Sequence, residues 1–263
     1  AGSTTTIAGN LSVTGTGAGA SDIGALDDVT MDIANFVDGI LIQPDSDGSA
    51  PTTGTLNGAT GNVGIGKQVF TALTEGDYNT AIGNAAFMGV TTGSRNIGLG
   101  TGAGGTGTPG GNITTASGQL CLGNDEITHA HVQVDWTIAS DQRDKTDFTA
   151  LDLGLDFVND LEPLTYKWDK RSKYGDKTAD DYDLNAQTPD GTHKEDWLDI
   201  GFKAQEVEAL EIAAGYNKVN KTNLTTTFTS DGKQYGIQYS KFVPILVKAI
   251  QELSAKVEAL ENA

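Results

Sequence analysis

The chain has 263 residues, of which 37% are hydrophobic and only 7% aromatic, and it carries a formal net charge of −18 at pH 7. Such an acidic chain is repelled by phosphate backbones and by anionic membrane surfaces, so nucleic acid and lipid headgroups are poor partners. It contains one cysteine, Cys121, which excludes an intrachain disulfide framework. No apolar run reaches the roughly 18 residues of a transmembrane helix, and no membrane insertion is predicted.

The first 60 residues form an N-terminal β-rich or attachment segment in our interpretation. Residues 1–20 consist mainly of Gly, Ser, Thr and Ala, which is typical of a flexible lead or of a short β segment ordered by partner chains. Residues 21–50 carry more apolar side chains, and this pattern predicts a short helix and one or two strands.

Residues 61–125 contain a repeat. The motif Asn-Val-Gly-Ile-Gly at 62–66 recurs in related form at 79–83 and 96–100, a spacing of 17 residues, and a degenerate copy at 119–123 follows an insertion rich in Gly and Thr. So short a coil cannot bury its own apolar face, so it must stack on neighbouring coils or on other chains. The branched residue before each final glycine is expected to point inward: Ile65, Ile82, Leu99 and Leu122.

The repeat resembles the left-handed β-roll head repeats of trimeric autotransporter adhesins, which also recur in phage fibres. The resemblance covers Gly61 to Gly123 and implies a trimeric shaft. A single-chain β-solenoid is the alternative, although four coils on their own leave much edge and apolar surface exposed.

Residues 126–139 are expected to form a β linker with a candidate metal site. Within it His129 and His131 lie two positions apart, so in a strand both imidazoles face the same side. Three such pairs on a threefold axis would supply six nitrogens, which suits an octahedral divalent iron or nickel ion better than tetrahedral zinc. The alternative is two histidines without a metal. The apolar residues of the alternating run are Val132, Val134, Trp136 and Ile138.

The composition changes abruptly near residue 140. Of the 34 glycines, 27 precede Ser140, whereas 15 of the 17 basic residues follow it. This change predicts a second region, over residues 140–263, with the composition of an ordinary α+β domain. We expect a helix between Leu151 and Leu161, a strand over Leu164–Trp168, a polar excursion over 169–196 that is too hydrophilic to be core, and a strand-rich stretch up to Tyr239.

The C-terminal stretch is the clearest helix in the sequence. Its apolar residues alternate in spacing between three and four, which is the seam of a coiled coil, and charged residues such as Glu252 flank it. We expect this helix to be one strand of an intermolecular bundle, the alternative being packing against its own domain. The seam consists of Val243, Leu246, Ile250, Leu253, Val257 and Leu260.

Three motifs occur in order in this second region. They are Ser140-Asp-Gln-Arg-Asp-Lys145, Gly201-Phe-Lys-Ala-Gln-Glu-Val207, and Tyr239 followed by Lys248-Ala-Ile-Gln-Glu-Leu253. In these motifs the chain from Ser140 to the end resembles the S74 peptidase family, the self-cleaving intramolecular chaperone domain of bacteriophage tail fibres and tailspikes.

The resemblance implies a single-turnover autoproteolytic serine peptidase that cuts between Ala139 and Ser140. Ser140 would be the nucleophile, and Lys145 would be the base that takes its proton. Asp144 stands where apolar or basic residues are more usual in the family. A carboxylate beside Lys145 favours the charged lysine and would weaken it as a base.

Four further residues of the motifs are candidate supporting groups. Asp141 and Arg143 would hold the loop as orienting groups rather than reactants, and Gln205 and Glu206 belong to the central motif. Without the downstream motifs, the Ser140-Asp141 pair would read only as a helix N-cap.

Together these features predict a tail fibre or tailspike protein of the virion, assembled in the host cytoplasm. The expected fold is an N-terminal repetitive β shaft (trimeric β-roll or β-solenoid) followed by a C-terminal α+β chaperone domain ending in a long helix, in an intertwined homotrimer. The chemistry requires no cofactor. The expected partners are the chain itself, other virion tail proteins and a host-cell surface receptor.

An adhesin tip with a retained, non-cleaving trimerisation domain is the main alternative. The loops at 71–78 and 104–111 are the places where receptor contacts would be sought. A carbohydrate-active tailspike is disfavoured, because we see no long β-helix with paired acidic residues. A generic cellular hydrolase is disfavoured as well, because it has little use for a processing site beside a β shaft.

Overall fold

A computed structural model describes residues 29–44, 50–177, 179 and 181–263. The expected lead at residues 1–20 lies outside the described residues, as does the start of the segment 21–50. The chain divides into two compact units, Ala1–Glu126 and Ile127–Ala263, each with its own hydrophobic core.

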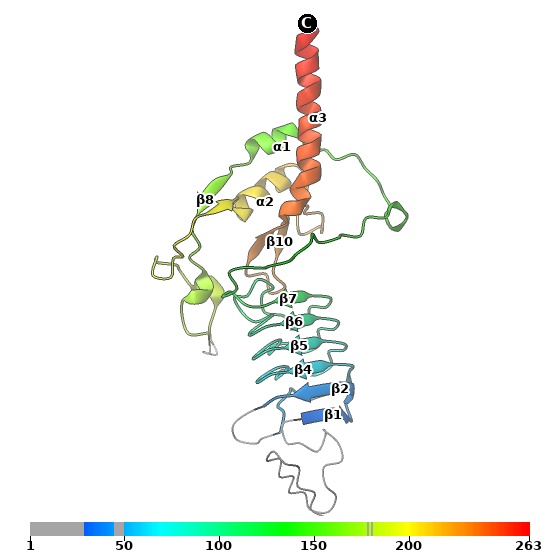
Figure 1. Cartoon of the computed structure of the whole chain (residues 1–263), viewed down its shortest axis with the longest axis vertical. Helices are drawn as coiled ribbons and strands as arrows, with labels where there is room; N and C mark the ends of the chain where they lie inside the picture. The colour runs from blue at the N-terminus through cyan, green and yellow to red at the C-terminus, as the bar shows by residue number, and fades with distance from the viewer. Residues whose placement is uncertain (1–28, 45–49, 178, 180) are drawn as a thin grey trace, which may run out of the picture. The chain divides into compact units, whose positions relative to one another are not determined.

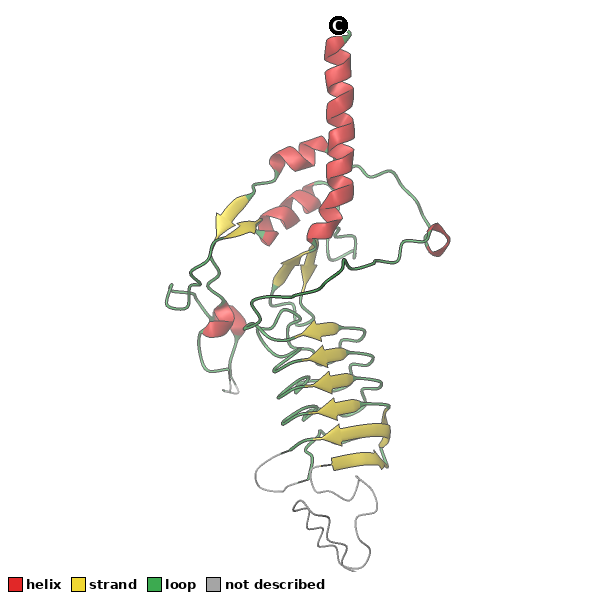
Figure 2. Ribbon diagram, in the orientation of Figure 1, coloured by secondary structure: helices red, strands yellow, loops and turns green. Residues whose placement is uncertain are grey.

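The first unit is a stack of short strands (Figures 1 and 2). An antiparallel hairpin of β1 (Val29–Ile33) and β2 (Phe36–Ile42) opens it. From β2 onward the strands pair in parallel, in the order β2-β4-β5-β6-β7, with β3 also paired to β2. Each motif copy of the repeat contributes one strand of this ladder. The strands are β3 (Ala59–Thr60), β4 (Val63–Ile65), β5 (Thr80–Ile82), β6 (Ile97–Leu99) and β7 (Leu120–Leu122).

The branched residues before the final glycines point outward, so the expectation that they face the core is wrong. Ile65, Ile82, Leu99 and Leu122 are 40%, 43%, 39% and 52% exposed. Side chains alternate along a strand, so the residue one position earlier faces the core instead. These inward positions hold Gly64, Ala81, Gly98 and Cys121.

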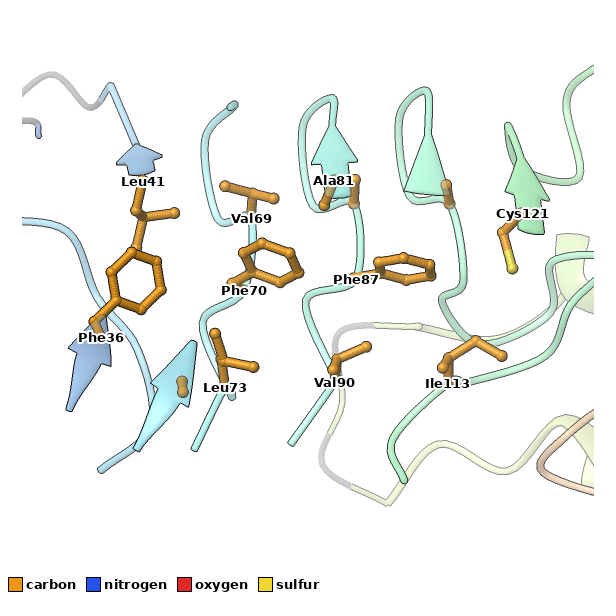
Figure 3. Packing of buried hydrophobic residues seen from close by; sticks show 13 residues of the cluster. Phe36, Leu41, Val69, Phe70, Leu73, Ala81, Phe87, Val90, Ile113 and Cys121 are labelled. Carbon is orange, nitrogen blue, oxygen red and sulfur yellow. The ribbon is translucent and has the colours of Figure 1, made fainter. Parts of the chain in front are cut away.

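Two phenylalanines explain why the inward strand residues are small (Figure 3). Phe70 and Phe87 are fully buried, and a Cβ atom on Gly98 would lie 2.8 Å from the ring of Phe87. Both phenylalanines have positive φ, 58° and 47°. Such a backbone costs on the order of 1–2 kcal/mol, and burial of the ring returns roughly 1.5–3 kcal/mol. In the next coil the equivalent residue is Gly104, with Ile113 beside it.

Buried asparagines connect one coil to the next. Asn62, Asn79 and Asn96 are fully buried. Asn62 Oδ1 accepts from Asn79 N (2.9 Å), Asn79 Oδ1 from Asn96 N (3.0 Å), and Asn96 Oδ1 from Gln119 N (2.8 Å). Their Nδ2 groups donate to the main-chain oxygens of Gly76, Gly93 and Ala116. The asparagine of the motif therefore satisfies main-chain groups at the corner of each coil.

The final glycine of the motif is required by close backbone approach. Gly66 and Gly83 have φ of 139° and 136°. A Cβ atom on Gly66 would lie 2.4 Å from the carbonyl oxygen of Gly83, and one on Gly83 would lie 2.6 Å from that of Gly100. No side chain fits between these coils.

The insertion at 104–111 is folded into the first unit. Thr108 Oγ1 donates to Gly105 O at 2.8 Å, and a Cβ atom on Gly110 would lie 2.6 Å from Cys121 Sγ. The insertion thus covers the core beside the last strand, which leaves little of it exposed for receptor contacts. Its buried residues are Gly104, Gly107, Thr108 and Gly111.

The second unit is built from helices, short turns and two-stranded sheets. Helices α1 and α3 pack together, and α2 contacts the β10–β11 hairpin. The core consists of Leu153, Phe157, Val207, Phe242 and Ile245. None of the helices in the described residues has the length and apolar content needed to cross a membrane. The elements are η2 (Gln142–Asp144), α1 (Leu155–Asp160), β8 (Leu164–Tyr166), η3 (Arg171–Lys173), η4 (Leu184–Ala186), β9 (Asp199–Gly201), α2 (Ala204–Ala213), β10 (Thr226–Phe228), β11 (Tyr235–Ile237), η5 (Tyr239–Lys241) and α3 (Phe242–Glu261).

The polar excursion at 169–196 contributes to the interior, against the expectation that it is too hydrophilic to do so. Leu184 is fully buried. Arg171 holds this segment in place, because its guanidinium donates to Asn185 Oδ1 (2.8 Å) and to the main-chain oxygen of Lys233 (2.7 Å). One leucine buried in a polar stretch is too weak a periodic signal to detect in the sequence.

Residues 127–139 form no strand in the single chain, although their alternation predicts a β linker. Every residue from 126 to 150 is exposed. No main-chain hydrogen bond within the described structure involves residues 127–139. A strand requires a partner for its main-chain groups, and the described residues provide none for this segment.

Candidate functional site

A tight turn brings Ser140 and Lys145 together. The turn is η2 (Gln142–Asp144), and it is closed by a hydrogen bond from Lys145 N to Gln142 O (3.2 Å). As a result Lys145 Nζ donates to Ser140 Oγ at 2.6 Å. A hydroxyl in contact with an amine is the arrangement of a nucleophile and its base, because an uncharged amine can take the hydroxyl proton.

Asp141 holds the turn from its N-cap position. Its Oδ1 accepts a hydrogen bond from Arg143 N (2.9 Å), and its Oδ2 lies 2.6 Å from Arg143 Nη2. The side-chain and main-chain hydrogen bonds from Arg143 lower the pKa of the Asp141 carboxyl, and the same side-chain contact raises the pKa of Arg143. Because Asp141 is the N-cap, the Ser140 hydroxyl is left to contact Lys145.

The Ser140–Lys145 pair is open to solvent in the single chain, since both residues lie in the exposed run 126–150. An ammonium group surrounded by water is strongly solvated and retains its proton. Lysine can act as a base only where its surroundings exclude water. The single chain therefore supplies the geometry of a serine–lysine pair without the dry environment that the chemistry needs.

Asp144 forms no ion pair with Lys145 in the described structure. Its main-chain N–H donates to Asp141 O (3.2 Å) within the turn, whereas the Lys145 side chain is directed to Ser140. That Asp144 weakens Lys145 as a base stays a prediction.

The structure does not bring Gln205 and Glu206 to the reacting atoms of the single chain. Both lie exposed in the first turn of α2, where Glu206 forms an ion pair with Lys203 (2.7 Å) that raises the pKa of the lysine. Among the described residues no hydrogen bond joins either of them to Ser140 or Lys145.

The second and third motifs pack on each other. The Tyr239 hydroxyl accepts a hydrogen bond from Phe202 N (3.2 Å), and a Cβ atom on Gly201 would lie 2.2 Å from that hydroxyl. The rings of Phe202 and Phe242 stack with centroids 5.4 Å apart. Gly201 and Phe202 of the central motif thus pack against Tyr239, just before α3 begins.

Tyr166 lies beside this contact. Burial, followed by the negative charge of Asp199 and the neighbouring Tyr239, raises the pKa of Tyr166 to about 12. Trp168 Nε1 also donates to Asp199 Oδ2, at 3.2 Å. The cluster joins the β8–β9 sheet to the start of α3.

Glu252 has a role that the sequence analysis missed. It was placed on the flank of the α3 seam, but its Oε2 accepts a hydrogen bond from Leu155 N (2.7 Å), at the start of α1, where Gly154 offers no side-chain cap. This bond, and then the ion pair with Lys248, lowers the pKa of Glu252. No local pattern could indicate a contact across 97 residues.

Helix α3 carries two apolar faces. Phe242, Ile245 and Ala249 are buried within the second unit. The six residues of the predicted seam are all exposed in the single chain, so the seam is not the face that packs against the chain's own domain. The exposed residues are Val243, Leu246, Ile250, Leu253, Val257 and Leu260.

The histidines of the candidate metal site lie on one side of their segment. The rings of His129 and His131 are parallel, with centroids 5.7 Å apart, and Thr128 Oγ1 is 2.8 Å from His129 Nδ1. No cluster of three or more His, Cys, Asp or Glu residues suited to a metal ion occurs in the described part of the chain. A metal at this pair would need further ligands beyond these two histidines.

Comparison with known families identifies the domain that begins at the serine. The family model of peptidase S74, described as the chaperone of endosialidase, matches residues 140–216. The matched stretch begins at Ser140 and includes η2, α1 and α2. The match covers less than a third of the chain and ends before Tyr239 and α3.

A search of curated proteins found no match to this chain. A search of solved structures found none either.

Proposed function

We propose that the chain is a structural protein of a bacteriophage tail fibre or tailspike. Its C-terminal domain drives trimerisation and folding of the β shaft and then cleaves itself off between Ala139 and Ser140. The observation that carries the proposal is the 2.6 Å contact between Lys145 Nζ and Ser140 Oγ, at the first residue of the matched domain.

The proposed cleavage consists of two acyl transfers. Lys145, in its uncharged form, takes the Ser140 hydroxyl proton while Oγ attacks the carbonyl carbon of Ala139. The peptide C–N bond breaks, an ester to Oγ forms, and Lys145 returns the proton to the released amine of Ser140. Water then attacks the ester, which frees the Ala139 carboxylate and restores the serine hydroxyl. Each chain reacts once, so the reaction is maturation.

Exclusion of water links the cleavage to assembly. The pair is exposed in the single chain, where Lys145 Nζ and Ser140 Oγ lie 2.6 Å apart. Contacts with other copies would dry the pair and favour the uncharged amine. Cleavage therefore follows assembly, which prevents a lone chain from losing the domain that assembles it.

Two exposed apolar surfaces support a homotrimer. One is the outer face of β4–β7, where the residues before the motif glycines point away from the core. The other is the seam of α3. A net charge of −18 per chain opposes self-association, so copies require strong apolar contacts of this kind.

A trimerisation domain solves a register problem that the shaft creates. Coils that repeat every 17 residues can pair with the wrong coil of another chain at little cost. A domain that trimerises first holds the three chains in one register. Its removal then leaves a kinetically trapped shaft, because refolding would need the lost domain. The mature protein is then a component of the virion, in contact with other tail proteins and with a host receptor.

The test is the intact mass of the purified full chain, with native mass for its stoichiometry. The wild type is expected to give two fragments, 1–139 and 140–263, from a trimer. Ser140→Ala and Lys145→Met are expected to slow cleavage by at least about 100-fold, because each removes one member of the proton-transfer pair. The matched controls are Thr146→Ala, an exposed hydroxyl beside the turn, and Lys203→Met, an exposed lysine of α2.

The outcomes separate the two functions considered. Fragments that meet at Ala139/Ser140 in the wild type and both controls, but not in the Ser140 and Lys145 variants, would establish self-processing. An intact wild-type trimer would refute the peptidase and leave the alternative, an adhesin tip with a retained trimerisation domain. A monomer at every concentration would refute both.

A further inference from the structure

We propose that residues 130–138 form a β-strand that pairs with the same segment of other copies of this chain. The apolar side chains at even positions face those copies. The inference deepens the trimer of the proposed function and rests on it. It assigns a partner to the stretch directly before the scissile bond, for which the described part of the chain provides none.

This segment is fully exposed and makes no main-chain hydrogen bonds within the described residues of the single chain. Large apolar side chains are seldom exposed in a contiguous run unless a partner covers them. The exposed apolar residues are Val132 at 61%, Val134 at 75%, Trp136 at 71% and Ile138 at 73%.

The sequence of this segment also has the alternating pattern of a strand. The apolar positions alternate strictly with polar ones and are β-branched or aromatic, which is the composition that favours strands. The parallel rings of His129 and His131 show that residues two apart already face the same side. The segment thus has the sequence pattern of a half-buried strand, although it bends at residues 133–134 in the single chain.

The charge of the segment and the other exposed apolar surfaces favour another copy of this chain as the neighbour. Residues 127–139 contain no Glu, Lys or Arg and only one Asp, Asp135, in a chain of net charge −18, so copies meet there with little repulsion. Among the apolar surfaces that the described residues expose are the outer face of β4–β7, this segment and the seam of α3. One symmetric association covers each surface with its own counterpart, whereas a foreign partner would have to match all three. Identical strands in register also place each β-branched residue against its like.

The pairing has two consequences. It holds Ala139 and Ser140 at the end of an ordered strand, so the scissile bond is presented in a defined, extended conformation. It also turns His129 and His131 toward solvent, because both lie at odd positions, opposite the apolar face. An axial metal held by these histidines would require the reverse orientation.

The test uses cysteine cross-linking in the full chain. The background is Ser140→Ala, which keeps the segment attached, with Cys121→Ala, which removes the only native cysteine. Alanine suits that site because Ala81 holds the equivalent position in β5. Single cysteines then replace one exposed residue at a time, and the oxidised samples are compared on non-reducing gels. The even positions are Val132, Val134 and Trp136, and the matched odd controls are Gln133, Asp135 and Thr137.

The expected result is that even positions yield disulfide-linked dimers more than about fivefold faster than odd positions, since only facing cysteines approach closely enough. Hydrogen exchange of the Ser140→Ala chain provides a second measurement, with slow amides over 130–138 in the trimer.

Each other outcome overturns the inference in a distinguishable way. A trimer by native mass without this parity, and with fast amides, refutes the strand pairing and leaves the proposed function standing. Faster cross-linking at odd positions refutes the orientation and favours axial histidines, which metal analysis of the wild type would then test. A monomer by native mass refutes the proposed trimer itself.

Discussion

Substitution of Asn79 tests whether the asparagine ladder stabilises the first unit. In Asn79→Ala, the main-chain N–H of Asn96 loses its acceptor and the carbonyl of Gly93 loses its donor. Both groups are buried, and each buried unpaired group costs about 1–3 kcal/mol. We therefore expect a loss of about 2–6 kcal/mol in the free energy of unfolding of this unit, with the lower end applying if water enters the space left by the amide.

The measurement is urea unfolding of the Ser140→Ala chain at fixed protein concentration, followed by far-ultraviolet circular dichroism. All three tryptophans, Trp136, Trp168 and Trp197, lie after the coils, so tryptophan fluorescence reports the second unit in the same sample. The dichroism transition of the coils is expected to move to lower urea, with the fluorescence transition unchanged.

The control is Asn84→Ala, the same substitution at an exposed asparagine of the same coil whose side chain makes no hydrogen bond. It should change stability by less than about 0.5 kcal/mol. If Asn79→Ala and Asn84→Ala unfold within that margin of each other, the ladder contributes no stability and our reasoning about the motif asparagine is wrong.

Three further predictions concern other contacts. Gly83→Ala is expected to separate two coils, because the new methyl would lie 2.6 Å from the Gly100 oxygen; native amide protection in the coils of this variant would contradict this. Glu252→Gln should lower stability at neutral pH, and this difference should fade as pH falls from about 4 through the depressed pKa of Glu252, because the ionised carboxylate is the stabilising form; a loss independent of pH would show that the charge is irrelevant. Tyr166 should titrate late, since its pKa is raised to about 12; its contribution to stability is therefore present below about pH 10 and lost as pH rises through about 12. Tyr166→Phe should remove this alkaline loss, as measured by thermal unfolding, and a persistent loss would assign it to another group.

The sequence indicated the elements of the second unit better than their contacts. The coiled-coil spacing located α3, and Pro163 limited the preceding helix, because both signals are local. The hydrogen bond from Leu155 N to Glu252, and the seating of Tyr239 on Phe202, join residues far apart in sequence. No periodicity encodes such pairs, so the sequence could not reveal them.

The candidate cleavage site was predicted as a set of residue types, and the structure adds its geometry. The signature indicated Ser140 and Lys145 only through family resemblance. Their 2.6 Å contact arises because Asp141 caps the intervening turn. Gln205 and Glu206 share the family pattern, but they make no contact with the pair within one chain, because motif membership carries no information about distance.

The 17-residue period of the motif by itself determined that the first region stacks coils, because a chain that repeats its apolar residues must repeat its backbone path. Which strand face is buried was decided only by tertiary structure. Alternation in the motif allows either face to point inward, and the rings of Phe70 and Phe87 fill the interior and leave room only for Gly, Ala or Cys beneath them. In residues 127–139, too, the sequence determines the pattern and tertiary contacts decide whether the strand forms. Their alternation encodes a strand, but a strand forms only where a neighbour supplies hydrogen bonds, and no other described residue of the chain supplies them here.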